Sequence, residues 1–294
     1  MIRRVPRLSA SVLLCCFFFL LLFAQTGAGA NPQEYQVGQK LSVPGLQLPE
    51  DTYILHVQNA DVTGDGTEDT VILVGQPQKD NPSFYKMVNV VVRNGKTGAF
   101  SALSPMQVKD YLQGYEPTMF LGDFTGDKLK DVMVTVATGG SGATSNHLIA
   151  SWKNNKPVVI FGENENMGLK IKGRYLDGFK AELHSEVLKK TFIVDLSGLK
   201  KLYIDANVYA PDGKYIYQDP SPGPINIFSD PYYSLVPVEA DNDGVYDLQG
   251  KQNVWGPIHI ITVTDVSSTW KYKDKKWTPI DANYTLTYNI MNNN

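Results

Sequence analysis

Apolar residues in this chain gather in short runs that are separated by clusters of Asp, Gly, Asn and Thr, and this pattern predicts β-strands. The clearest runs are Thr70–Val74, Val88–Val92 and Val132–Ala137. No stretch carries the apolar period of a long amphipathic helix, and only Ser104–Tyr115 and Leu199–Ala206 are compatible with short helices. The hydrophobic pattern therefore predicts an all-β protein.

An acidic segment of nine residues recurs along the chain, each time after an apolar strand. The first acidic loop is 61–69 (DVTGDGTED), the second is 123–131 (DFTGDKLKD) and the third is 239–247 (EADNDGVYD). Their starts are 123 − 61 = 62 and 239 − 123 = 116 residues apart. Because 116 is close to twice 62, a copy that lacks the acidic pattern is expected near Asp177-Gly178.

The sequence around each loop repeats as well. A strand enters each loop, and a β-rich segment, a polar turn and a closing strand follow it; Trp152 and Trp270 lie 118 residues apart, close to the loop spacing. Each unit is therefore predicted to hold four antiparallel strands, with the acidic loop between the first and the second. The units are placed at approximately 45–105, 106–165, 166–225 and 226–294. Such units are typical of β-propeller blades, about four to five in this length with or without closure of the ring, or of a stacked β array.

The first thirty residues have the pattern of a signal peptide. Arg3, Arg4 and Arg7 precede the apolar run Val12–Ala24, and Ala28-Gly-Ala30 has the small residues of a cleavage site. We expect cleavage after Ala30, a single all-β domain over 31–294, and a secreted or otherwise extracytoplasmic protein without a transmembrane segment. The apolar run is shorter than the roughly 20 residues that a membrane-spanning helix needs.

Composition narrows the classes of partner and the sources of stability. Both cysteines, Cys15 and Cys16, lie in the signal segment, so the mature chain must be stabilised by a large core or by metals rather than by disulfides. Removing three arginines leaves 27 − 3 = 24 basic residues against 30 acidic ones. The chain has no basic stretch suited to binding nucleic acid, so nucleic acid is not expected as a partner.

The acidic loops have the chemistry of calcium sites. Calcium binds six to eight oxygen ligands, and alternate positions of a tight loop can place oxygens around one point. Left-handed backbone is expected at the fourth and sixth positions, which Gly or Asn fills in most copies. Clustered carboxylates would repel each other without a cation; the alternative is three metal-free Asp-Gly turns. The predicted ligands are the side chains of Asp61, Thr63, Asp65, Asp69, Asp123, Thr125, Asp127, Asp131, Glu239, Asp241, Asp243 and Asp247, with the carbonyl oxygens of Thr67, Leu129 and Val245.

The pattern D-x-[DT]-x-D-G-x-x-D after a strand, repeated in an exported chain of bacterial type, resembles the FG-GAP/VCBS repeats of integrin-α-like β-propellers. The resemblance implies calcium at the first, third, fifth and ninth side chains and the seventh carbonyl. Four positions depart from the family pattern: Thr63 and Thr125 replace carboxylates, Lys128 stands where Gly is usual, and Glu239 is longer than Asp.

The sequence offers no catalytic residues. The Gly-rich segment 138–146 lacks the features of a phosphate loop or a nucleophile elbow, and its simplest interpretation is a flexible hairpin loop. If the protein binds a ligand, this loop is one candidate edge of the site. His56, His147, His184 and His259 have no metal-ligand spacing. Two functions stay open: a non-catalytic extracellular binding module for a polysaccharide or protein, and a calcium-dependent hydrolase or lyase acting on polysaccharide or another envelope polymer.

Overall fold

The computed structural model describes residues 35–104, 111–217, 226–256, 259 and 261–285. The predicted signal peptide lies outside the described residues, and so do residues 105–110 of the helix expected over Ser104–Tyr115. The rest of that segment is not helical: it is a turn that leads into the strand Gly114–Gly122. Among the described residues, no helix combines the length and the apolarity that crossing a bilayer requires.

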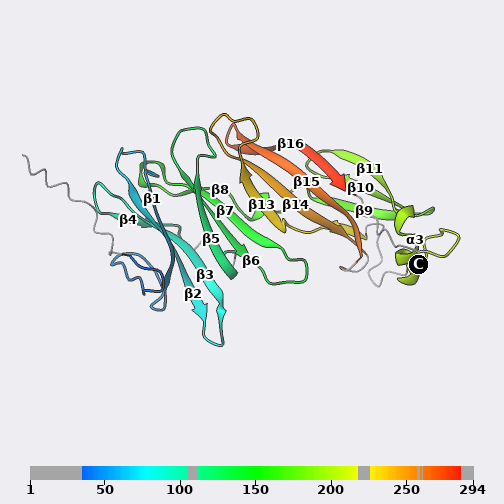
Figure 1. Ribbon diagram of the computed structural model, residues 1–294, viewed down its shortest axis with the longest axis horizontal. Helices are drawn as coiled ribbons and strands as arrows, with labels where there is room; N and C mark the ends of the chain where they lie inside the picture. The colour runs from blue at the N-terminus through cyan, green and yellow to red at the C-terminus, as the bar shows by residue number, and fades with distance from the viewer. Residues whose placement is uncertain (1–34, 105–110, 218–225, 257–258, 260, 286–294) are drawn as a thin grey trace, which may run out of the picture. The chain divides into compact units, whose positions relative to one another are not determined.

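The prediction of an all-β protein is confirmed (Figure 1). Its helical segments are short, and Lys200–Asp205 (α3), with the 3₁₀ turn Ser197–Leu199 before it, confirms the helix expected over Leu199–Ala206. The other helical segments are Lys153–Asn155 (η1) and Glu163–Asn166 (α2). The strands are β1 Tyr53–Ala60, β2 Asp69–Gln78, β3 Asn81–Arg93, β4 Phe100–Ala102, β5 Gly114–Gly122, β6 Asp131–Ala137, β7 Ser145–Ser151, β8 Val158–Phe161, β9 Ile171–Leu176, β10 Lys180–Ser185, β11 Lys190–Asp195, β12 Ile227–Ser229, β13 Ser234–Val238, β14 Asp247–Trp255, β15 Thr262–Lys273 and β16 Lys276–Thr285.

The strands form two antiparallel sheets. The first has the order β1-β2-β3-β5-β6-β7-β8 with β4 beside β3, and the second has the order β11-β10-β9-β12-β14-β15-β16 with β13 beside β14. Strands β1–β4, β5–β8 and β13–β16 each repeat the predicted unit of four strands with an acidic loop between the first and the second. The first two units are joined at a corner, where β3 pairs with β5 only at Phe84↔Tyr115 and Tyr85↔Gly114. The described residues show two sheets and no closed ring of blades.

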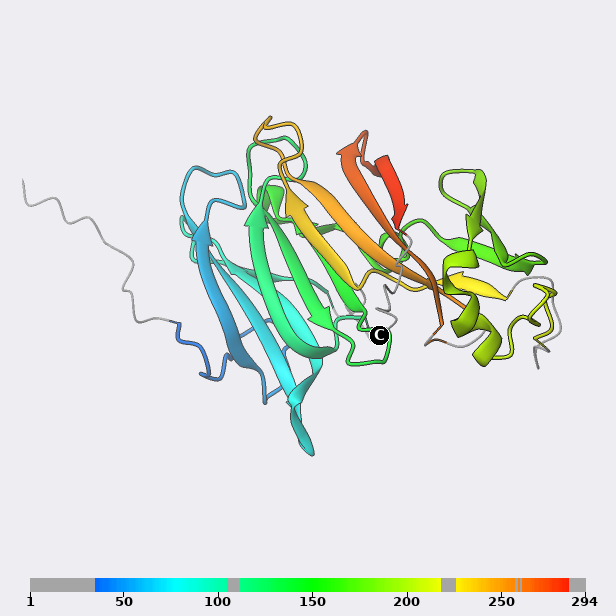
Figure 2. The same ribbon diagram turned by 45° about the vertical axis from the view of Figure 1, so that its right-hand side comes forward.

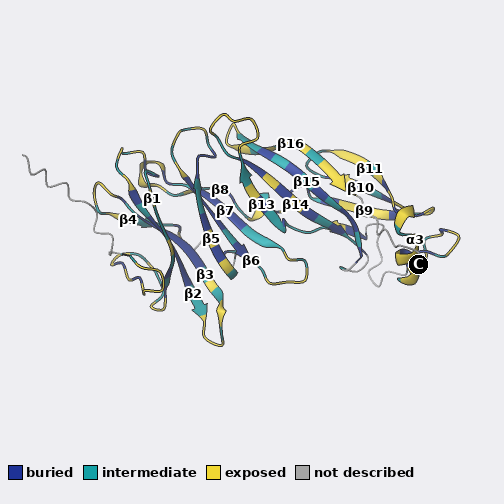
Figure 3. Cartoon of the chain, in the orientation of Figure 1, coloured by how far each residue is buried: buried dark blue, intermediate teal, exposed yellow. Residues whose placement is uncertain are grey.

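The central strands of the first sheet are buried on both faces, which explains their continuous apolar runs (Figure 3). On β2, Val71 and Leu73 pack against Val132 and Val134 of β6, in a cluster that Trp152 completes. Fully burying an aliphatic side chain of this size stabilises the fold by roughly 1.5–3 kcal/mol. Period-two alternation thus sends neighbouring residues of one strand into two different cores.

The outer faces of this sheet are covered by other parts of the chain. Ile72 and Val74 of β2 face the segment that carries Leu41 and Val43. Met133 of β6 belongs instead to a core shared with the second sheet. The indole nitrogen of Trp277 on β16 donates to the carbonyl oxygen of Ile160 on β8 at 2.9 Å, which also ties the two sheets together. The four-stranded units are therefore stacked as layers.

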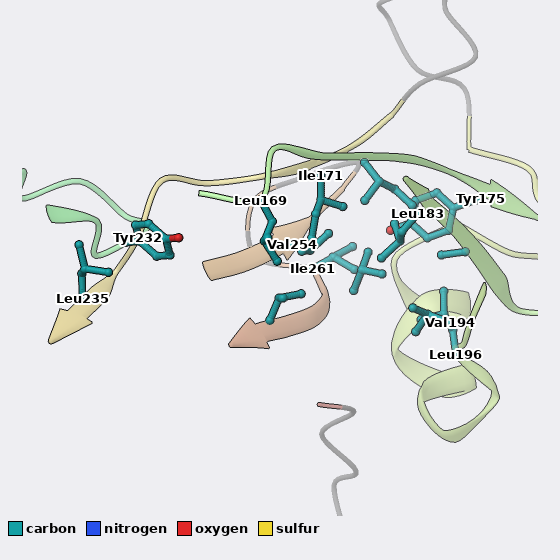
Figure 4. Close-up of a cluster of buried hydrophobic side chains, with 14 of the residues drawn as sticks. Leu169, Ile171, Tyr175, Leu183, Val194, Leu196, Tyr232, Leu235, Val254 and Ile261 are labelled. Atoms are coloured by element: carbon teal, nitrogen blue, oxygen red, sulfur yellow. The ribbon is translucent and has the colours of Figure 1, made fainter. Parts of the chain in front are cut away.

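The second sheet is closed over a core rich in tyrosine (Figure 4). Its strands β9–β11 occupy the place of the expected copy without an acidic loop, and a short turn containing Gly178 joins β9 to β10. Tyr175 and Tyr209 pack edge to face with their ring centroids 5.8 Å apart. Tyr232 is also fully buried there.

The three acidic loops lie in a row along one edge of the stacked units (Figures 1 and 2). The seventh residue of each later loop packs on the fourth residue of the loop before it. A Cβ at Gly64 would lie 2.9 Å from Leu129, and one at Gly126 would lie 3.6 Å from Val245. The backbone amide of Tyr246 also donates to the carbonyl oxygen of Asp123 at 2.7 Å. Stacking of the layers therefore brings the loops into direct contact.

The contact between the first two loops predicts different costs for two substitutions. Gly64 and Gly66 both have left-handed backbone, but no atom lies within 4 Å of a Cβ placed at Gly66. We expect Gly66→Ala to lower the free energy of unfolding by about 1 kcal/mol through backbone strain, and Gly64→Ala to cost about 1 kcal/mol more by overpacking against Leu129. Urea unfolding measures both. Leu129→Ala should remove the extra cost of Gly64→Ala; equal costs for the two glycines would contradict this packing.

His147 on β7 predicts a pH-dependent contribution to stability. Its Nδ1 lies 2.9 Å from Thr135 Oγ1, its Nε2 has no hydrogen-bond partner, and burial lowers its pKa from 6.5 to about 4. A lowered folded-state pKa favours the neutral ring, so this contribution is present above pH 6.5 and is lost as the pH falls towards 4. We expect the loss to reach about 3 kcal/mol.

The measurement is the difference in the free energy of unfolding between the wild type and His147→Gln, followed from pH 7 to pH 4. Using the difference cancels the titration of the carboxylates, which both proteins share. A difference that stays constant over this range would show that His147 titrates normally in the fold.

Candidate functional site

The three acidic loops have the same backbone conformation, as the sequence predicted. The fourth residues, Gly64, Gly126 and Asn242, have φ of 78°, 77° and 56°. The sixth residues are also left-handed, with φ of 83° at Gly66, 68° at Lys128 and 82° at Gly244. Lys128 thus adopts the conformation in which a side chain is strained. The three loops share one backbone conformation, so the hydrogen-bond partners of equivalent carboxylates can be compared directly.

The first carboxylate is held by the loop's own backbone in two of the three copies. Asp61 accepts hydrogen bonds from the amides of the fourth and sixth residues at 2.6 and 2.9 Å. Asp123 does the same at 2.7 Å for both. Glu239 is exposed and forms no such bond. Its longer side chain leaves the third loop without the bracing that the other two share.

The fifth carboxylate has the same two partners in every copy. One oxygen of Asp65, Asp127 and Asp243 accepts the amide of the seventh residue, at 3.0, 3.1 and 2.9 Å. The seventh residues Thr67, Leu129 and Val245 are therefore fixed through their amides. The other oxygen accepts a hydrogen bond from a side-chain nitrogen. The residue that carries this nitrogen lies near the C-terminal end of the third strand of the unit or just after it.

These nitrogen donors were not predicted as site residues. Asn94 Nδ2 donates to Asp65 Oδ2 at 2.6 Å, and also to Thr63 Oγ1 at 3.2 Å. Lys153 Nζ lies 2.9 Å from Asp127 Oδ2. Lys271 Nζ lies 2.7 Å from Asp241 Oδ2 and 3.0 Å from Asp243 Oδ2. A usable signal was present in the sequence, because a lysine directly follows each of the paired tryptophans.

The ninth carboxylate separates the three loops most clearly. Asp69 accepts three amides, those of the second and third residues of the loop and that of Gly95, each at 3.0 Å. Asp131 accepts the amide of Phe124, also at 3.0 Å, and its Oδ1 has no hydrogen-bond partner. Burial raises the pKa of Asp131 to about 6. The ninth carboxylate is therefore less completely hydrogen-bonded in the second loop than in the first.

In the third loop the ninth carboxylate has no hydrogen bond at all. Asp247 is 1% exposed, and neither of its oxygens has a hydrogen-bond partner. Burial, the largest influence, and the charges of Asp241 and Asp243 raise its pKa, while Lys271 opposes the shift. A buried carboxylate without hydrogen bonds is costly, and such groups call for an unseen ion, water or functional role.

The predicted calcium ligands fit a cation unequally. Within the described ranges, no three Asp, Glu, His or Cys side chains are placed around a common point that could hold a metal ion. In the first loop, backbone amides and Asn94 stabilise the carboxylates, so their clustering there does not require a cation. The third-position hydroxyl of Thr125 lies 3.5 Å from Asp123 Oδ1 and belongs to the same internal network. Only the third loop leaves a buried carboxylate unsatisfied at both oxygens.

A second polar cluster lies between the hairpin loop 138–144 and the second sheet. His259 Nε2 lies 2.9 Å from Asp230 Oδ2, and the indole nitrogen of Trp255 donates to Asp230 Oδ1 at 2.8 Å. A Cβ at Gly142 would lie 2.9 Å from the His259 ring. In the described part of the chain, Ser141 forms no hydrogen bond with His259. His259 lies in a turn before β15, which begins at Thr262.

A groove lies beside β1, β3 and β5. It has a volume of about 680 Å³, prolines and tyrosines form much of its wall, and His56 and Glu116 also line it. Glu116 has left-handed backbone, with φ of 48°, at a break in the pairing of β5 with β6. The groove lies away from the acidic loops and contains no pair of carboxylates.

Comparison with known proteins gives a family. The YybI C-terminal domain family matches residues 169–285, which include the second sheet and the third acidic loop. The chain is also 32% identical to YybI of Bacillus subtilis (strain 168) over 218 residues, which cover 74% of this chain and 79% of that protein. No solved structure matches the chain.

The predicted membership of the FG-GAP/VCBS family is therefore wrong, because the similarity found is to YybI. The prediction depended on three nine-residue loops and their spacing. Hydrogen bonds that nearby amides donate to the carboxylates account for much of that motif, and they require only Asp and left-handed residues at the right positions. A turn of this kind can recur in unrelated folds, so it identified a local shape and not a family.

The ninth carboxylate is fully hydrogen-bonded in the first loop and has no hydrogen bond in the third. The same Asp→Asn substitution is therefore predicted to have different effects on stability in the two loops. Asp69→Asn places an amide nitrogen among three N–H donors, and we expect it to lower the free energy of unfolding by about 3 kcal/mol. Asp247→Asn removes a buried charge without losing a hydrogen bond, so stability should stay unchanged or rise slightly. Urea unfolding at pH 7 with a chelator present measures both. Similar losses for the two variants would show that Asp247 has partners in solution.

Proposed function

This chain belongs to the YybI family, and from that premise we propose that it is an exported, calcium-binding β protein, a non-catalytic binding module that holds its calcium in the third acidic loop. The single observation that carries the proposal is Asp247, a buried carboxylate with no hydrogen bond at either oxygen. A hard divalent cation supplies what this side chain lacks.

The third loop carries further oxygen donors of the kind that calcium binds. Asp241 and Asp243 act electrostatically on Asp247, and the loop also carries Glu239 and the carbonyl oxygen of Val245. Together these are the predicted ligands of the third loop. Glu239 is free of the internal bonds that hold Asp61 and Asp123, so its side chain is available to reach inward. Calcium would draw these groups together and compensate the charge of Asp247.

The second loop is a weaker candidate and the first loop the weakest. Asp131 keeps one oxygen without a partner, but Lys128, Lys130 and Lys153 balance the three carboxylates of the second loop. In the first loop the ninth carboxylate, Asp69, accepts three hydrogen bonds from backbone amides of the protein. We therefore propose one calcium ion in the third loop at concentrations of about 10⁻⁴–10⁻³ M, the range of extracellular modules.

The stacked units support a role as a rigid scaffold. We propose that each four-stranded unit behaves as a blade-like layer in an open array, with calcium stiffening the end of the row of loops. The groove walled by tyrosines and prolines is the candidate surface for a polysaccharide or protein ligand, because aromatic faces stack on sugars and pack against extended peptides.

A second candidate is the calcium-dependent hydrolase or lyase, acting on polysaccharide or another envelope polymer. The observation that favours it is the Asp230–His259 pair beneath the loop 138–144, because a histidine oriented by a carboxylate can act as a general base. Loss of polymer cleavage in His259→Gln, with calcium binding intact, would establish this second function. A wild type that binds the polymer without cleaving it supports the binding module.

Calcium should raise the melting temperature of the wild type. Free calcium at ten times its dissociation constant stabilises by about 1.4 kcal/mol, which corresponds to roughly 2–4 °C for a chain of this size. Asp247→Asn should abolish the increase, and it should also abolish terbium luminescence sensitised by Tyr246 and Trp270. Differential scanning calorimetry and terbium titration are the measurements.

The matched control is Asp274→Asn, which removes an exposed carboxylate from the turn between β15 and β16. It should respond to calcium as the wild type does. If the wild type melts at the same temperature with calcium and with a chelator, the proposed calcium site is contradicted.

A further inference from the structure

We infer that Lys271 is a tethered competitor for the calcium ion of the third loop, so that calcium binds by displacing its ammonium group. This inference rests on the calcium site proposed above. Lys271 lies on β15, next to Trp270, and Trp270 pairs with Leu248 of β14, the residue that follows Asp247. Its Nζ bridges Asp241 Oδ2 at 2.7 Å and Asp243 Oδ2 at 3.0 Å.

The ammonium group stands where the loop would place a cation. Asp241 and Asp243 are the third and fifth positions, which alternate along the loop and converge on Nζ in the way that they would converge on a metal. Lysine is a compact point charge on a flexible stem, so it can enter such a site and leave it by rotating its side chain. The Lys271 side chain is 28% exposed, which gives it a path into solvent.

Lys271 satisfies the loop only in part. The ammonium group brings one positive charge to four carboxylates, those of Glu239, Asp241, Asp243 and Asp247. It forms no hydrogen bond with Asp247, whose oxygens both stay without a partner. A divalent ion with six to eight ligand positions can bind Asp247 together with the two carboxylates that Lys271 now bridges. The unsatisfied carboxylate therefore favours exchange of lysine for calcium.

The other loops indicate that this arrangement is specific to the third. Lys153 in the second loop contacts only Asp127, and the corresponding donor in the first loop is the neutral Asn94. In neither loop does an ammonium group bridge the third and fifth positions, because those third residues are Thr63 and Thr125. Competition between an internal ammonium and a metal ion is thus expected at the third loop alone.

The first test compares calcium affinity in Lys271→Gln and Lys273→Gln by isothermal titration calorimetry at low ionic strength. Lys273 ends the same strand, and its substitution removes the same charge. Removing the competitor should tighten calcium binding by roughly tenfold or more in Lys271→Gln, since a charge about 4 Å away contributes at least about this factor. Lys273→Gln should change the affinity by less than about twofold.

The second test uses the wild-type protein, so it does not depend on how a variant folds. Lysines are acetylated by limiting acetic anhydride with and without calcium, and modification is read by peptide mass spectrometry. Calcium should increase the modification of Lys271 several-fold, because the displaced ammonium enters solvent, and should leave Lys273 unchanged as the internal reference.

The outcomes separate this inference from the function on which it rests. Wild type that binds calcium with an affinity equal to or higher than that of Lys271→Gln, and unchanged acetylation of Lys271, would overturn the competition and leave the calcium site standing. Absence of calcium binding in both the wild type and Lys271→Gln would overturn both. Binding by Lys271→Gln alone would support the inference in its strongest form, with lysine excluding calcium from the native loop.

Discussion

Burial of each central strand on both of its faces is the constraint on which the rest of this structure depends. A four-stranded antiparallel sheet that is apolar on both faces cannot stand alone in water, so it must find a cover on either side. Val71 and Ile72 are neighbours on β2, yet they enter different cores. The covers are the preceding segment, the next unit and the second sheet. Stacking follows, and the turns that join the strands are left at the edges.

Much of this architecture could be predicted from the sequence because its determinants are local. Apolar runs marked the strands, and the spacing of Trp152 and Trp270 revealed the repeating unit. Left-handed backbone at the fourth and sixth loop positions followed from the placement of Gly and Asn, and the structure confirms it even at Lys128. The way in which units pack could not be derived, because propeller blades and stacked layers need the same four-stranded pattern.

The prediction of calcium in the acidic loops rested on an incomplete physical argument. Repulsion among carboxylates was taken to demand a cation, although an N–H donor stabilises a carboxylate just as directly. Asp69 has three such donors, and one of them comes from Gly95, far along the chain. Partners of this kind depend on the register between strands, which composition and spacing do not reveal. The same limit hid Lys271, whose role follows from the pairing of β15 with β14.

The contacts between successive loops all have the same direction: a residue of the later loop packs on a glycine of the earlier one. Leu129 rests on a glycine of the preceding loop, and Val245 rests on the next glycine in the same manner. The corresponding residue of the last loop is Asn242, which is exposed and has the same left-handed backbone. Glycine at the fourth position of the first two loops leaves room for a side chain of the next layer. The seam between two neighbouring units therefore depends on a residue that has no side chain of its own.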